Sequence, residues 1–193
     1  MTRKIKTLIC DPAVHRLGLA LAAGLAASVA LFASPDDVMN MHAGHNTKVP
    51  AKLVELVRLA TWPFIDVNAT AGAGYMPAFG CVTGPDHGAM GIHYINGELV
   101  GDGEVDASRP EALIYEPSRN GLRLVGVEFI VDAAAWMKNH TSPPMLEGQA
   151  FQFVNSPNRY GIPAFFELHV WAWRDNPNGA FVDWNNNVSC EGQ

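Results

Sequence analysis

Residues 165–173, which read FFELHVWAW, constrain the fold most, because they indicate a strand that is buried on both faces. Side chains of a strand alternate between its two faces. One face is entirely apolar and consists of Phe166, Leu168, Val170 and Ala172. The other face holds two ionisable side chains among three aromatic ones: Phe165, Glu167, His169, Trp171 and Trp173. A buried ionisable group needs a partner, a shifted pKa or a metal ion. We therefore expect this strand to form one side of a functional site.

Three further ionisable residues occupy similar positions in the strands predicted at 90–96, 112–116 and 122–131: His93, Glu116 and Glu128. If the apolar faces of these strands line one core, the three side chains converge with His169. Two imidazoles and two carboxylates are a suitable ligand set for zinc, copper, iron or manganese. The leading hypothesis is a divalent metal site, in which Glu167 could act as the general base of a metal-assisted reaction.

Other interpretations of these residues remain open. A histidine in a strand is more often an ordinary hydrogen-bonded residue than a ligand, and Glu167 and His169 could satisfy each other without a metal. The chain contains no HExxH and no paired CxxC motif. Aromatic residues on strands suggest a binding module for a small apolar or carbohydrate ligand, with a pocket lined by Tyr94, Trp171 and Trp173. A third alternative is a structural protein of the cell envelope.

The N-terminal part has the pattern of a secretory signal peptide. Four basic residues precede an uncharged run at 17–33 that is rich in alanine, glycine and leucine. We interpret residues 1–33 as a cleaved signal and 34–49 as a flexible leader, followed by one domain at 50–193. The alternative is an uncleaved membrane anchor. Cleavage predicts a periplasmic or secreted protein with no stable membrane association.

Charge and cysteine content agree with export. Loss of residues 1–33 removes four of thirteen Lys/Arg and one of nineteen Asp/Glu, which leaves nine against eighteen and a net charge of −9. An acidic protein without a basic surface is not expected to bind nucleic acid. Of the three cysteines, Cys10 lies in the signal, so Cys81 and Cys190 are predicted to form a disulfide.

The leader carries a second candidate metal site. It contains two methionines and two histidines within seven residues: Met39, Met41, His42 and His45. Thioether and imidazole groups together suit copper. A leader with scattered methionine and histidine and no metal is the commoner case, and the role of this segment stays open.

The order of elements predicts an α+β fold. An amphipathic helix is expected from residue 50, with Leu53, Leu56, Val57 and Ala60 on its apolar side, and a short helix at 64–71. A turn-rich loop at 80–88 and an exposed acidic loop at 97–110 surround the strand at 90–96. A hairpin, a helical turn at 133–139, a strand at 145–154 and the final strand follow. Helices followed by strands at hairpin spacing predict a mostly antiparallel sheet, open or curled into a partial β-barrel.

Several blocks of this sequence resemble a family of small exported proteins from soil and environmental bacteria. The blocks are MGIHYIN (90–96), PEALIYEP (110–117), LRLVGVEF (122–129), ELHVWAW (167–173) and the NPNG-containing segment at 176–185. The resemblance covers most of the chain from about residue 49. That family is uncharacterised, so the resemblance implies an exported bacterial protein but no activity or cofactor.

Overall fold

The computed structural model describes residues 51–84 and 86–192. The predicted signal at 1–33 and the leader at 34–49, with its Met39–His45 group, lie outside these residues. Every helix in the described ranges is too short or too polar to cross a lipid bilayer.

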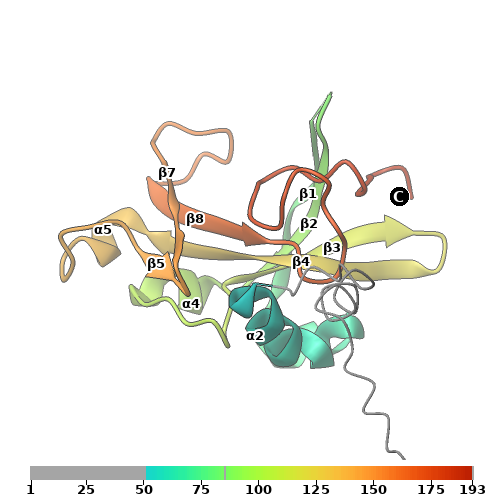
Figure 1. The fold of residues 1–193 in the computed structure, drawn as a ribbon, viewed down its shortest axis with the longest axis horizontal. Coiled ribbons are helices and arrows are strands. Elements are labelled where there is room, and N and C mark those ends of the chain that lie inside the picture. Colours follow the sequence, from blue (N-terminus) through green and yellow to red (C-terminus); the bar gives the residue numbers. More distant parts are fainter. Residues whose placement is uncertain (1–50, 85, 193) are drawn as a thin grey trace, which may run out of the picture. The chain divides into compact units, whose positions relative to one another are not determined.

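Six antiparallel strands form one sheet in the order β1-β2-β3-β4-β8-β7, and this sheet curls into a half-barrel (Figure 1). The predicted α+β fold with a partial barrel is confirmed. The strands are β1 (Met76–Gly84), β2 (Gly88–Ile95), β3 (Ala112–Ser118), β4 (Gly121–Asp132), β7 (Gln152–Val154) and β8 (Phe165–Val170). Strands β1 to β4 are adjacent in the sheet in the order in which they occur in the sequence. Strand β8 pairs with β4, and residues 133–164 lie between the two in the sequence.

Strand β8 is buried on both faces, as its sequence predicted. Phe166, Leu168 and Val170 belong to the main core, on the face of the sheet that packs against the N-terminal helix. The alternation ends with the strand, because the Ala172 N–H donates to the Val170 carbonyl and the chain turns. Trp173 is therefore not on the face of Glu167, contrary to expectation: it is partly buried and packs against the main core.

The predicted first helix is α2 (Lys52–Thr61), and Leu53, Val54 and Val57 are its buried apolar residues. Leu56 and Ala60, which were expected on the buried side, are only partly buried. The helix packs on the sheet through a stripe rotated toward Val54. A 3-10 turn, η1 (Trp62–Ile65), follows where Pro63 ends the helix, and α3 (Ala69–Gly72) comes next.

Three predicted segments differ from the structure. Residues 80–84, expected as a loop, belong to β1, whose pairing with β2 is interrupted between Ala78 and Cys81. The acidic loop begins with a short helix, α4 (Gly97–Asp102), capped by the Asn96 side chain. The predicted strand at 145–154 divides into β5 (Met145–Leu146), β6 (Gln149–Ala150) and β7, because Glu147 and Gly148 form a turn with positive φ. One helical turn, α5 (Ala133–Trp136), links β4 to this region.

The C-terminal segment covers the second face of the sheet (Figure 1). The predicted disulfide between Cys81 and Cys190 is present and joins this segment to β1. Val188 is buried against Ile114, Val125 and Trp171. The second face thus has an apolar cluster under the C-terminal segment and another around Ala112, Ile130 and Phe165.

Candidate metal centre

Strand register places three predicted ligands on the second face of the sheet, away from α2. Glu128 on β4 pairs directly with His169 on β8 and, on its other side, with Ala112 on β3. His93 on β2 pairs with Ile114, two residues along β3 from Ala112. Cross-strand partners point to the same face, so the three side chains share it. Along β4 and β8 they lie between the two apolar clusters of that face.

Small residues leave room for the side chains to meet across the intervening strand. His93 and Glu128 are separated by β3, whose side chains on this face are Ile114, opposite His93, and Ala112, opposite Glu128. Ala112 is fully buried and bears a single methyl group, which leaves space beside Glu128. On β4, a side chain on Gly126 would collide with the Val170 carbonyl and the Trp171 ring, so glycine lets Trp171 lie beside His169.

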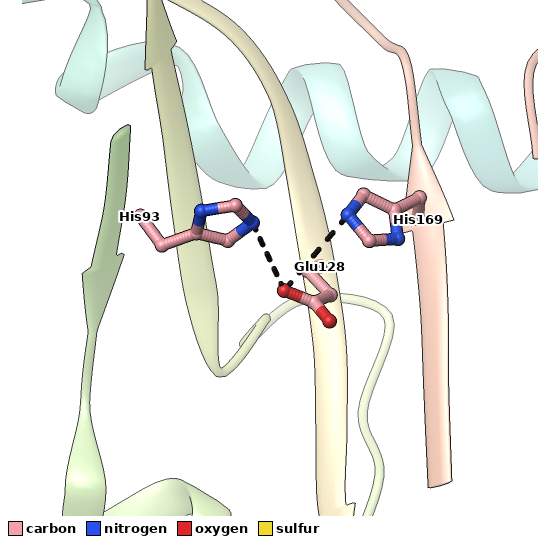
Figure 2. A group of neighbouring side chains, drawn as sticks. All are labelled: His93, Glu128 and His169. Atoms are coloured by element: carbon pink, nitrogen blue, oxygen red, sulfur yellow. Dashed lines mark ion pairs between the residues drawn. The ribbon is translucent and has the colours of Figure 1, made fainter. Parts of the chain in front are cut away.

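The three side chains form a compact and almost fully buried group. Glu128 Oε2 lies 3.2 Å from His93 Nε2 and 4.0 Å from His169 Nε2. Figure 2 shows the two imidazoles on opposite sides of the carboxylate, both directed at the same oxygen. The rings are nearly perpendicular, and one candidate ligand atom from each residue lies within 4.8 Å of the other two.

These separations are compatible with a shared metal ion. Zinc bonds to imidazole nitrogen and carboxylate oxygen at about 2.0–2.2 Å, which puts tetrahedral ligand atoms roughly 3.4 Å apart. The observed 3.2 and 4.0 Å bracket that value. Both ring nitrogens of His169 and Nδ1 of His93 are buried without a hydrogen-bond partner. Of these, His169 Nε2 faces the Glu128 carboxylate and is the atom that a metal ion between the three side chains would satisfy, so the cluster could hold one.

The charges in the cluster are strongly coupled. Burial by itself would raise the pKa of Glu128, but the charge of His169 and the interaction with His93 lower it. Burial likewise opposes the charged form of His169, but Glu128 and Asp183 raise its pKa. Burial and the charge of Glu128 raise the pKa of Glu167 to about 9. Glu128 is therefore the anion of the group, and the neutral form of Glu167 is favoured beside it.

Asp183, which comes from the C-terminal segment, is a residue of the site that was not predicted from the sequence. Its Oδ1 lies 3.6 Å from His169 Nδ1, the nitrogen that does not face Glu128, and accepts a hydrogen bond from Gln152 Nε2. A carboxylate behind a ligating histidine fixes the orientation of the ring and raises its basicity. No local signal marks Asp183, because the segment has no periodic pattern and its position depends on how it folds back.

Glu116, the fourth predicted ligand, is not brought into the cluster. It points to the same face of the sheet, but its carboxylate pairs with Arg123 and accepts a hydrogen bond from the Ser189 backbone. Its role in the structure is to anchor the C-terminal segment. Glu167, the predicted general base, lies beside Glu128 but is not one of the three grouped ligands.

The aromatic residues predicted to line one pocket are dispersed. Tyr94 stacks edge-on against Tyr115 beside the main core, and Trp173 lies against Trp62 on the same side of the sheet. Trp171 lies on the opposite face, under the C-terminal segment. The structure does not bring the three rings together.

Glu111 is a further buried carboxyl group outside the cluster, and the sequence analysis did not identify it. It is 2 % exposed and accepts a hydrogen bond from the Ile130 N–H through Oε2. Burial, opposed in part by this hydrogen bond, raises the pKa of Glu111 to about 8. Glu111 contributes to the structure around β3 and β4 and does not belong to the ligand group.

Comparisons of the chain with protein-family models, with curated proteins and with solved structures found no match. The geometry of the cluster therefore carries the functional conclusion.

Proposed function

We propose that the protein binds one divalent transition-metal ion through His93, Glu128 and His169. The observation that carries this proposal is that His169 is 1 % exposed and that neither of its ring nitrogens has a hydrogen-bond partner, although Nε2 faces a buried carboxylate and a second imidazole. In a binding module or structural protein without a metal, Nε2 of His169 would stay unsatisfied. Zinc and ferrous iron suit two imidazoles and a carboxylate, and copper and manganese are tested beside them.

Three protein ligands leave a coordination position free for water or a substrate oxygen. A metal bound there would act as a Lewis acid and lower the pKa of that water. Glu167 lies beside Glu128 outside the ligand group, and because its raised pKa of about 9 keeps it protonated, we propose it as a proton donor and not as the general base. Asp183 would hold His169 in position through Nδ1.

We further propose that the protein acts outside the cytoplasm, in the periplasm or after secretion. The disulfide between Cys81 and Cys190 is typical of an oxidising compartment. The signal-like pattern at 1–33 and the resemblance to an exported bacterial family support the same location.

Metal content tests the proposal directly. Protein purified from the periplasm without chelator is analysed for zinc, iron, manganese and copper, before and after reloading with each metal. We expect about one equivalent of one metal in the wild type and less than a tenth of that in His93→Ala and His169→Ala. His140→Ala is the matched control, because His140 stacks on Trp136 away from the cluster. Wild-type protein that stays metal-free after reloading would refute the metal site, as would variants that load like the wild type.

A further inference from the structure

A polar pocket lies between α2 and the chain that follows β8, and the proposed function does not use it. Its lining consists of Arg58 on α2, Trp173, Arg174 and Asp175 after β8, and Asn187 from the C-terminal segment. None of these residues belongs to the candidate metal centre. The pocket has a volume of about 470 Å³, within the roughly 300–1,000 Å³ typical of ligand pockets. It is therefore large enough for a small molecule.

The two arginines of this pocket differ from the other basic side chains of the described chain. Within the described residues, Arg58 and Arg174 are partly buried, whereas every other lysine and arginine is exposed. The ion pairs that lysine and arginine form in the same ranges all involve other basic residues. A partly buried charge without a counterion is costly, and two like charges in one pocket also repel each other. A bound anion would offset both effects.

Backbone carbonyl groups hold both guanidinium groups in place. Arg58 Nε donates to the Ala172 carbonyl at 2.5 Å, and Arg174 Nε donates to the Asn187 carbonyl at 2.8 Å. A guanidinium group has five N–H donors, so these bonds leave the four at its Nη1 and Nη2 end. That end is the planar fork with which arginine binds two oxygens of an anion at once. Because the side chains are already anchored, less conformational entropy is lost when an anion binds.

The charge of the pocket favours an anion although the chain as a whole is acidic. The formal net charge of the chain is −6, but two arginines and one aspartate give the pocket lining a net charge of +1. Asp175 is exposed, so solvent and salt screen its repulsion of a bound anion. The arginines are partly buried, and their attraction is screened less.

We infer that this pocket binds a tetrahedral oxyanion, a phosphate or sulfate group, through the free ends of Arg58 and Arg174. A carboxylate has two oxygens and is matched by one arginine fork, whereas a tetrahedral oxyanion has oxygens for both. The anion is either free or the end group of a small ester. In an ester, the organic part would lie against the Trp173 ring, which lines the same pocket. This site does not depend on the proposed metal centre.

The test measures the binding of inorganic phosphate, sulfate, acetate and phenyl phosphate to the full-length protein by calorimetry at low ionic strength. We expect phosphate and sulfate to bind at least tenfold more tightly than acetate. Arg174→Gln should weaken phosphate binding at least tenfold, and Arg174→Lys, which keeps the charge but lacks the fork, at least threefold. Arg119→Gln is the matched control, because it removes the same charge at an exposed position, and it should change phosphate affinity less than twofold. Arg58→Gln is the second variant, and urea unfolding checks that each variant is folded.

The outcomes assign the site and the source of the anion. Phenyl phosphate that binds at least threefold more tightly than inorganic phosphate identifies an ester, and equal affinities identify the free anion. Wild-type protein that binds neither phosphate nor sulfate at 10 mM, on the order of the weakest useful affinity, overturns the inference. Acetate that binds as tightly as phosphate also overturns it. Folded Arg174→Gln and Arg58→Gln variants that bind phosphate like Arg119→Gln would place the anion elsewhere, the metal centre included, and would overturn it as well.

Discussion

The disulfide between Cys81 and Cys190 should be the largest single covalent contribution to the stability of this fold. It joins residues 109 positions apart in the sequence. A cross-link that closes a loop of this length lowers the entropy of the unfolded chain by an amount worth about 4.8 kcal/mol at 25 °C, and removal of native disulfides typically costs 2–5 kcal/mol. The free energy of unfolding of single domains is about 5–15 kcal/mol, so the loss of this bond should remove a substantial part of the stability.

Urea unfolding of the double variant C81A/C190A, followed by tryptophan fluorescence, measures this contribution. With a slope of about 2 kcal/mol/M, a loss of 2–5 kcal/mol lowers the midpoint by about 1–2.5 M. The wild type under a reducing agent should unfold at the midpoint of the variant. A loss below about 1 kcal/mol would refute the reasoning. It would mean that contacts such as the one between Ser189 and Glu116 restrain the C-terminal segment even in the unfolded chain.

Three further predictions concern carboxyl groups in and around the cluster and at Glu111. Zinc at about one hundred times its Kd should stabilise the wild type by about 2.7 kcal/mol and raise Tm by about 5–11 °C. Glu116→Gln should keep this increase in Tm, and Glu128→Gln should lose it. An equal increase in both variants would contradict the ligand assignment. Asp183→Asn should weaken zinc binding 10- to 100-fold in a competition titration with a chromogenic chelator, whereas Asp175→Asn, at an exposed position, should not; equal affinities would show that Asp183 does not support His169. Because burial raises the folded-state pKa of Glu111 to about 8, the folded protein binds the extra proton between about pH 4.5 and 8, and stability falls as the pH rises through this window. Glu111→Gln should therefore gain on the order of 5 kcal/mol over the wild type at pH 9 and little at pH 4.5 in urea unfolding. A gain independent of pH would rule out this carboxyl as the cause.

Part of the fold could be predicted because period-two alternation is a local property of the chain. The residues of β8 predict a strand that is buried on both faces. In the structure, Phe166 and Leu168 are buried on the side of α2, and Glu167 and His169 face the other side. The secondary-structure prediction was wrong where the residue types favour a turn but the backbone pairs with a neighbouring strand. β1 contains glycines and a threonine typical of a turn, yet β2 holds it as a strand through backbone pairing.

Candidate ligands could be identified from the sequence, but the sequence did not show which of their side chains lie close together. Glu116 and Glu128 both lie on strands and on the same face of the sheet. Only register decides that Glu128 stands opposite His169 while Glu116 stands opposite Arg123. Asp183 could not be predicted at all, because its distance from His169 depends on how the C-terminal segment folds back.

The sequence by itself determined the α+β class, the disulfide pair and the burial of ionisable side chains in the strands. These features follow from the composition, the number of cysteines and the alternation of apolar and polar residues, which are properties of the sequence that do not depend on how the segments pack. The tertiary structure decided which of those side chains form a group and how His93 on β2 comes within reach of Glu128 across β3. The physical reason is that a metal centre is set by distances between strands, and those distances depend on register and on the size of the residues that lie between.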